Sequence, residues 1–268
     1  MQETEMAKSI GSSRDAIGAR AARHLELAFR GFTVGHGAEL GTNYLRWTTC
    51  EAHPLGNVAI VSDPSDADAA RAAVEPLVAR NLPSAVLFPQ GVSAAAARSV
   101  VALGFADQGA MPAMAVDIDR MAATSLPPGC AWARIGEGGG ARGWSEAFAA
   151  GYGVPMGLAR LFSPEELGAD MAGDAQTQYF AIVRDGRAVA TSLLYLADGL
   201  AGIYCVATVP EERGKGLGAH VTAEALRAAQ ALGYGVGVLQ SSLAGHSIYL
   251  GLGFEDLATV PMFVRMPG

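Results

Sequence analysis

The sequence contains no run of apolar residues long enough to cross a membrane. Half of its 268 residues are hydrophobic and the mean hydropathy is +0.24, yet no stretch reaches the roughly 18 to 20 apolar residues that a membrane helix requires. The first residues mix acids, a lysine and polar groups, unlike a secretory signal or a transit peptide. We therefore expect a soluble, cytoplasmic protein with a large core and no membrane partner.

Cysteine is scarce, and the three that occur, Cys50, Cys130 and Cys205, lie far apart. Their number is odd and they form no CxxC pair, so the sequence favours neither a disulfide framework nor a zinc site. His220 and His246 have no second ligand at metal-binding spacing. We expect reduced thiols, no bound metal, and no functional role for these two histidines.

Basic residues are in the minority, with 19 Lys and Arg against 26 Asp and Glu, a formal charge of -7 and a pI near 5.2. Binding to a nucleic-acid backbone depends on dense Lys and Arg that neutralise phosphates. The composition therefore argues against a nucleic-acid partner and suits a small or cationic ligand better.

Two adjacent prolines and a glycine in Ser125-Leu-Pro-Pro-Gly129 interrupt both helix and sheet. Because domains cluster at about 100 to 150 residues, we predict two domains, 1–126 and 127–268. In the first, periodicity predicts helices at 15–29, 66–82 and 94–103, a glycine-rich loop at 31–37, and strands at 43–50, 57–61, 85–88 and 113–118.

The second half begins with three strand-like runs, 179–183, 188–196 and 200–209, joined by Asp185-Gly186 and Asp198-Gly199, the dipeptides of tight hairpins. A glycine cluster follows, then a helix at 219–232, a strand at 235–239, a short helix at 247–252 and a last strand. The predicted fold class is α/β with a mixed sheet, in the order βββ, glycine loop, αβαβ.

The glycine cluster is Arg213-Gly-Lys-Gly-Leu-Gly218. A glycine-rich turn between a strand and a helix exposes unpaired backbone N–H groups at the positive end of the helix dipole, which suits a diphosphate. A purely structural turn is the other interpretation. Neither a Walker motif nor a dinucleotide GxGxxG is present, and no acid ends the next strand, so an NAD-binding oxidoreductase is disfavoured.

The pattern Arg213-x-x-Gly216-x-Gly218 resembles the acetyl-CoA signature (Q/R)xxGx(G/A) of the GNAT acetyltransferases. Ser247-Ile-Tyr-Leu-Gly-Leu-Gly-Phe254 resembles the next motif of that family, with Tyr249 at its tyrosine. The two motifs in this order cover roughly 130 to 265. Ser242 departs from the pattern, because many members have asparagine there.

The resemblance implies transfer of an acetyl group from acetyl-CoA to a primary amine of a small molecule, with Tyr249 as the general acid for the leaving thiolate; a core tyrosine is the alternative reading. It also implies that backbone at the end of one strand holds the acetyl carbonyl and pantetheine, and that the glycine cluster cradles the pyrophosphate. The cofactor-binding residues would be Val206, Ala207, Thr208, Val209, Arg213, Gly214, Lys215, Gly216, Leu217, Gly218, Ala219 and Ser242.

The general base and the acceptor are not defined by these motifs. Some members carry a glutamate on the strand before the signature, where this chain has Gly202, and we favour a water relay over the nearby Glu211 and Glu212. Tyr152, Tyr195 and Tyr204 are predicted to contact the acceptor, although packing explains them equally well. A peptide or protein acetyltransferase, and an acetyl-CoA-binding regulatory module without turnover, remain alternatives, as do a monomer and a homodimer.

The first half echoes the second. Val61 and Phe105 are 44 positions apart, Val209 and Phe254 are 45 apart, and Leu103-Gly104-Phe105 matches Leu252-Gly253-Phe254. This suggests two GNAT-like domains in tandem. In the first, the acidic run 62–68 replaces the glycine cluster and Val100 replaces Tyr249, so we expect it to bind no acetyl-CoA.

Overall fold

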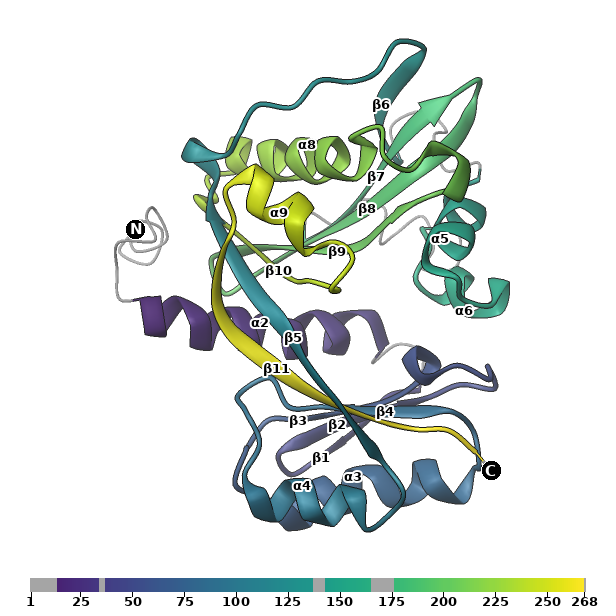
Figure 1. Cartoon of the computed structure of the whole chain (residues 1–268), viewed down its shortest axis with the longest axis vertical. Helices are drawn as coiled ribbons and strands as arrows, with labels where there is room; N and C mark the ends of the chain where they lie inside the picture. The colour runs from purple at the N-terminus through teal and green to yellow at the C-terminus, as the bar shows by residue number, and fades with distance from the viewer. Residues whose placement is uncertain (1–13, 34–36, 137–142, 165–175, 268) are drawn as a thin grey trace.

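The computed structural model describes residues 14–33, 37–136, 143–164 and 176–267. Within them, one mixed sheet of 11 strands runs through both halves in the order β1-β2-β3-β4-β11-β5-β10-β9-β8-β7-β6 (Figure 1). The strands are β1 (Glu39–Gly41), β2 (Tyr44–Thr48), β3 (Asn57–Val61), β4 (Ser84–Leu87), β5 (Ala106–Asp117), β6 (Cys130–Arg134), β7 (Thr177–Arg184), β8 (Arg187–Ala197), β9 (Leu200–Thr208), β10 (Val236–Gln240) and β11 (Glu255–Arg265).

Helices cover both faces of this sheet. They are α2 (Arg14–Thr33), α3 (Ala67–Ala79), α4 (Ala94–Val101), α5 (Trp144–Tyr152), α6 (Met156–Leu161), α8 (Leu217–Ala231) and α9 (His246–Leu252), with short 3-10 turns at Pro54–Gly56, Ile118–Arg120 and Pro210–Glu212. None of the described helices is long and apolar enough to cross a membrane. The mixed α/β fold class predicted from the sequence is confirmed.

The two halves repeat the same order of elements, β3-α3-β4-α4-β5 and β9-α8-β10-α9-β11. The match extends to single hydrogen bonds. Phe105 N donates to Val100 O, and Phe254 N donates to Tyr249 O. The glycines before these phenylalanines, Gly104 and Gly253, both have a positive φ that ends the helix. Val100 therefore occupies the position of Tyr249.

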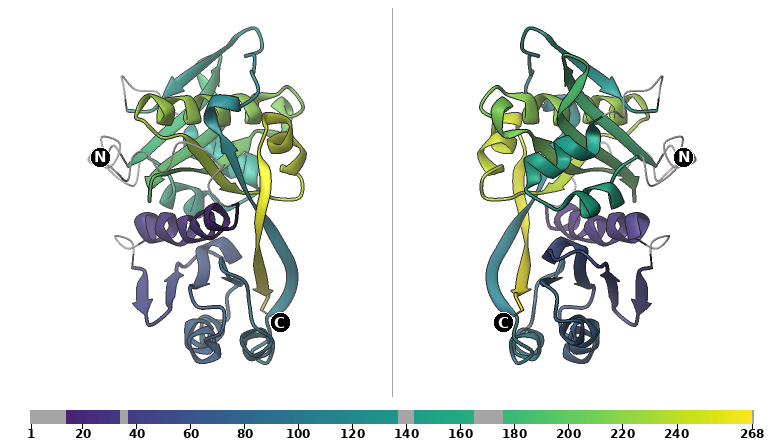
Figure 2. Two further views of the ribbon diagram at one scale, coloured as in Figure 1. Left: turned by 90° about the vertical axis from the view of Figure 1, so that its left-hand side faces the viewer. Right: turned by 90° about the vertical axis from the view of Figure 1, so that its right-hand side faces the viewer.

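The last strand of each half lies between the halves. β5 pairs with β10 of the second half from Val236↔Asp117 to Gln240↔Ala113, while β11 pairs with β4 of the first half. The two strands also pair with each other, and in side view both extend from the second half into the first (Figure 2). Each half thus completes the sheet of the other.

Helix α2 lies between the halves (Figure 1) and packs on β8, β9, β10, β5 and β11. The predicted break at Gly31 is wrong, because α2 continues to Thr33; residues 34–36 of the predicted loop lie outside the described residues. A Cβ at Gly31 would come within 2.7 Å of Tyr195 Cζ. Gly31 therefore lets the Tyr195 ring pack closely against α2, and it does not mark a turn.

The hairpins of the second half form as predicted. Asp185 and Asp198 have φ of 50°, and Gly186 and Gly199 have φ of 75° and 66°, as two-residue turns require. Sequence periodicity missed β1, β6, α5 and α6, and it placed the start of β5 at 113 instead of 106. The added stretch of β5 is largely exposed and contains Gly109 and Pro112, so it lacks the pattern of a strand.

Candidate functional site

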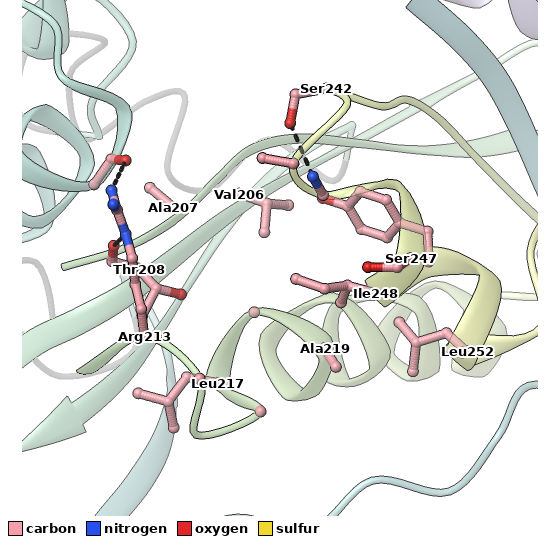
Figure 3. A pocket seen from close by; sticks show the side chains of 18 of the residues that line it. Val206, Ala207, Thr208, Arg213, Leu217, Ala219, Ser242, Ser247, Ile248 and Leu252 are labelled. Atoms are coloured by element: carbon pink, nitrogen blue, oxygen red, sulfur yellow. Dashed lines mark hydrogen bonds between the residues drawn. The ribbon is translucent and has the colours of Figure 1, made fainter. Parts of the chain in front are cut away.

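A cleft of about 900 Å³ opens where β9, β10, α8 and α9 meet. Labelled side chains of β9, α8 and α9 lie around it (Figure 3), and Gln240 of β10 also lines it. Its described lining is Ala123, Thr124, Gly151, Tyr152, Val206, Ala207, Thr208, Glu212, Arg213, Gly214, Gly216, Leu217, Gly218, Ala219, Gln240, Ser242, Ala244, Gly245, Ser247, Ile248, Tyr249, Gly251 and Leu252.

The cleft exists because two parallel strands part. β9 and β10 pair only at Ala201↔Gly237 and Gly202↔Val238, although β9 continues to Thr208. A bulge on β9 bends it away, since the register with β8 shifts here and Cys205 has a φ of 51°. Thr191 Oγ1 donates to Cys205 O at 2.9 Å and holds the bulge. The backbone of β9 beyond Gly202 therefore faces open space instead of a neighbouring strand.

The glycine cluster forms one wall of the cleft. Gly214 and Gly216 have φ of 75° and 78°, and a Cβ on either would meet no atom within 4 Å. Gly216 caps α8 without any side-chain hydrogen bond. The amide protons of the first helical residues, beginning with Leu217, have no acceptor within the helix. This leaves a set of donors, at the positive end of the helix dipole, directed into space that no side chain fills.

The cationic side chains of this loop, Arg213 and Lys215, do not point into the open space in front of these N–H groups. Arg213 donates to Gly151 O at 2.8 Å and to Thr208 O at 3.3 Å (Figure 3). Its guanidinium therefore ties the loop to the ends of α5 and β9. Lys215 Nζ lies 3.1 Å from Glu212, which also pairs with Arg184 at 3.4 Å. Anion binding in the cleft would consequently rest on backbone N–H groups more than on these side chains.

In the first half, a side chain occupies the N-terminus of the equivalent helix, α3. There the N-cap of α3 is Asp66, whose carboxylate accepts a hydrogen bond from Ala69 N at 2.8 Å. Asn43 Nδ2 donates to the same carboxylate at 2.9 Å. These hydrogen bonds hold the pKa of Asp66 below its ordinary value. An acidic side chain thus occupies the anion-binding end of the helix in this half.

Tyr249 projects from α9 into the cleft, with its ring 5.7 Å from that of Phe254. Burial, reinforced by the neighbouring Tyr152 phenol, raises the pKa of Tyr249 well above its ordinary value. The hydroxyl therefore keeps its proton at neutral pH and can donate it. Ser242, at the end of the β10 loop, accepts a hydrogen bond from Gly245 N at 3.2 Å and holds the turn that leads into α9.

The structure brings most of the predicted site residues to this cleft and leaves four elsewhere. Val209 donates from its backbone to Val189 O at 3.0 Å, and Lys215 points to Glu212. Tyr195 and Tyr204 pack against α2, where both rings contact Phe32 edge to face. Tyr152 is on the cleft and exposes 52% of its surface.

Sequence reasoning missed part of the lining. Thr124 comes from the linker, and its Oγ1 bonds His220 Nδ1 at 2.9 Å, so this histidine holds the linker on α8. Gln240 ends β10, and Ser247, Ile248 and Leu252 extend the surface of α9. The helical spacing of these α9 residues around Tyr249 was the signal that could have identified them.

His24 of α2 is fully buried against β9, with its ring stacked 6.0 Å from that of Tyr204. Its Nδ1 lies 2.9 Å from the Tyr204 hydroxyl. Burial lowers the pKa of His24 to about 4, and nearby Arg20 adds to this effect, while Asp198 and the backbone of Leu200 and Tyr195 oppose it. Burial also raises the pKa of Tyr204 well above its ordinary value.

The shifted pKa of His24 makes the protein less stable in acid. The unfolded chain takes up a proton near pH 6.5, the folded chain only near pH 4, so stability present above pH 6.5 is lost as pH falls to 4. The loss is about 3 kcal/mol at 1.36 kcal/mol per pKa unit. Between pH 6.5 and pH 4, we expect the free energy of unfolding, measured with urea, to fall by this amount more in wild type than in His24→Asn. Parallel pH curves for the two proteins would contradict the buried neutral imidazole.

Comparison with known proteins agrees with this geometry. Residues 146–254 match the model of the Acetyltransferase (GNAT) family. Residues 146–254 are therefore similar to a GNAT domain, and members of that family are acyltransferases that generally bind acetyl-CoA. No curated protein sequence matches the chain.

Solved structures resemble both halves together. A GCN5-related N-acetyltransferase from Kribbella flavida is 21% identical, with a TM-score of 0.60 over 92% of this chain and 96% of that one. A GCN5-related N-acetyltransferase from Sphaerobacter thermophilus is 15% identical, with a TM-score of 0.61 over 90% and 84%. At these identities the likeness concerns the fold, and it includes the first half.

Proposed function

We propose that the protein is an N-acetyltransferase that moves an acetyl group from acetyl-CoA to a primary amine of a small molecule. The observation that carries this proposal is the meeting, in one cleft, of three features: the parted backbone of β9, the uncapped N-terminus of α8, and the protonated hydroxyl of Tyr249. A cleft built only for packing would not leave backbone donors and a strand edge open together.

The residues fit the parts of acetyl-CoA. Amides from Gly214 to Ala219 would hold the pyrophosphate, because no Cβ fills the space above Gly214 and Gly216. The β9 backbone at Val206, Ala207 and Thr208 would hold the acetyl carbonyl and the pantetheine arm as a neighbouring strand would, by hydrogen bonds along its free edge. The protein would thus act mainly by positioning the reactants and polarising the carbonyl.

Tyr249 would act as the general acid. As the amine nitrogen bonds the acyl carbon and the carbon–sulfur bond breaks, the phenol would donate its proton to the leaving sulfur. Water would take the proton that the amine nitrogen loses and return one to the Tyr249 oxygen. The raised pKa of Tyr249 keeps this proton in place at neutral pH. General acids of this kind contribute about 10² to 10⁴-fold to a rate.

The first half would bind no acetyl-CoA. Asp66 occupies its helix N-terminus, and Val100, an apolar side chain, stands in place of Tyr249. Its β3 pairs with β4 up to Ile60↔Leu87, one residue before β3 ends at Val61, so no parted edge is present in the described residues of this half. The stoichiometry expected is one acetyl-CoA per chain.

Titration of the purified protein with acetyl-CoA, followed by a screen of primary amines for thiol release, tests the proposal. We expect one site per chain, and we expect Tyr249→Phe to bind acetyl-CoA with unchanged affinity while kcat falls by about 10²-fold or more. Tyr44→Phe, the same loss of a hydroxyl at a half-buried site outside the cleft, serves as a matched control and leaves kcat unchanged. Binding without transfer to any amine would favour the regulatory module, and an unbound wild type would refute the acetyl-CoA site.

A further inference from the structure

Arg213, the first residue of the glycine cluster, joins this loop to two other elements of the cleft. Its Nη2 donates to Gly151 O, near the end of α5, at 2.8 Å, and its Nε donates to Thr208 O, at the end of β9, at 3.3 Å (Figure 3). Both carbonyl groups lie outside the loop that is proposed to hold the pyrophosphate. The guanidinium therefore fixes the end of α5 relative to β9 and to the loop.

A glycine lets α5 come close to β9. A Cβ on Gly151 would lie 2.8 Å from Thr208 N and 2.8 Å from Ala207 Cβ, closer than a side chain tolerates. Ala207 and Thr208 belong to the stretch of β9 that is proposed to hold the acetyl carbonyl and the pantetheine arm. The end of α5 therefore lies directly against the part of the strand where the acyl group would be bound.

Tyr152, the last residue of α5, is the side chain that this arrangement brings to the cleft. Gly153 follows it with a φ of 74°, and its N–H donates to Ala149 O at 2.8 Å, which ends the helix. Burial raises the pKa of Tyr249 and the Tyr152 phenol adds to this effect, which requires the two phenols to be near each other. Tyr152 therefore places a half-exposed ring beside the proposed general acid.

The cleft offers an acceptor more apolar contact than charge. Glu212 is the one carboxylate among the described lining residues, and Arg184 and Lys215 already pair with it. An aromatic ring binds an apolar chain by removing it from water. We propose that Tyr152 contacts the carbon chain of the acceptor amine, and that Arg213 is a positioning residue that holds Tyr152 there by fixing the end of α5. This inference rests on the proposed acetyltransferase function.

The shape of the arginine side chain suits this role. Its donors form a rigid planar fork, so Nε and Nη2 hold carbonyl groups of two elements at once. A glutamine side chain ends where arginine has Nε. Its amide nitrogen can therefore still donate to Thr208 O but cannot reach Gly151 O. Although the GNAT signature allows glutamine at this position, we expect Arg213→Gln to keep the contact with β9 and to release the end of α5.

The test compares two ligands by calorimetry. In both, the sulfur of coenzyme A is joined through –CH₂–C(O)–NH– to an alkyl group that stands in the place of the acceptor chain, methyl in one ligand and propyl in the other. In wild type we expect the propyl ligand to bind about 4- to 15-fold more tightly than the methyl ligand, because each CH₂ group removed from water is worth about fourfold in affinity. We expect Tyr152→Ala to abolish this gain.

We expect Arg213→Gln to abolish the same gain while acetyl-CoA binds as in wild type. The double variant should bind the propyl ligand no more weakly than Tyr152→Ala alone, because Arg213 acts through this ring. The matched control is Arg71→Gln, at an exposed arginine of α3, which keeps the gain. Arg213 and Tyr152 are exposed, so we expect thermal midpoints close to that of wild type in all variants.

Three results overturn the inference and leave the proposed function intact. The first is equal affinity of wild type for the methyl and propyl ligands. The second is a propyl gain that survives in Tyr152→Ala or in Arg213→Gln. The third is a double variant in which the two losses multiply, since Arg213 would then not act through Tyr152. A wild type that binds neither acetyl-CoA nor the two ligands overturns the proposed function and this inference with it.

Discussion

A chain of residues 127–268 alone is expected to aggregate or remain unfolded and to bind no acetyl-CoA, although it contains the whole predicted site. Without β5, the pairing edge of β10 is exposed along Val236–Gln240 and β11 loses its neighbour on both sides. Buried Met114 and Val116 are also lost, at about 1.5 to 3 kcal/mol each. Typical net stability is only about 5 to 15 kcal/mol. Circular dichroism, sedimentation and acetyl-CoA titration measure the result.

The matched control is the same cut with both pieces present. Residues 1–126 and 127–268 produced together should assemble and bind acetyl-CoA, because the break falls in the exposed linker and both exchanged strands are kept. A fragment 127–268 that is monomeric, folded and binds acetyl-CoA as the full chain does would show that the exchange of β5 and β11 is dispensable.

The Gly216→Glu variant is expected to lose acetyl-CoA affinity by at least about 100-fold. Its side chain would enter the open space above the α8 N-terminus, where the pyrophosphate is proposed to lie. Repulsion between two like charges at 4 Å is about 4 kcal/mol at an effective dielectric constant near 20, and each 1.4 kcal/mol is tenfold in affinity. Calorimetric titration with acetyl-CoA measures the loss.

The control for backbone strain is Gly91→Glu. Gly91 also has a positive φ, 89°, with no atom within 4 Å of an added Cβ, but it lies in the first half, between β4 and α4. Both variants carry the same strain and the same charge, so we expect similar thermal midpoints. Equal acetyl-CoA affinity in the two variants would remove the glycine cluster from the proposed site.

Local features of the second half were predictable because each depends on residues close in sequence. The Asp-Gly hairpins, the turn from β9 into α8 and the glycine that ends α9 all follow from backbone preferences of a few residues. The position of Tyr249 in the cleft was predictable for the same reason, since the short helix after β10 fixes the direction of its side chain. The bulge at Cys205 was missed, because a cysteine at positive φ has no signature of its own.

The remaining differences between the predictions and the structure come from contacts between residues that are distant in sequence. Gly31 indicated a turn and instead lies in a helix against Tyr195. Arg213, part of the recognised signature, points to Gly151 and Thr208. Tyr195 and Tyr204 indicated acceptor contacts, and both pack on α2. Each of these residues contacts another helix or strand, and the periodicity of the sequence does not show where that helix or strand lies.

The sequence by itself determined the fold class, the repeat and the place of the glycine cluster and Tyr249, because turns, caps and short motifs act over a few residues. The tertiary structure decided that β5 and β11 cross between the halves, that β9 parts from β10, and that α2 brings His24 into the space left by Gly202. These features arise from strand edges and apolar faces that could be buried in several ways. Only the packing of the whole chain selects one.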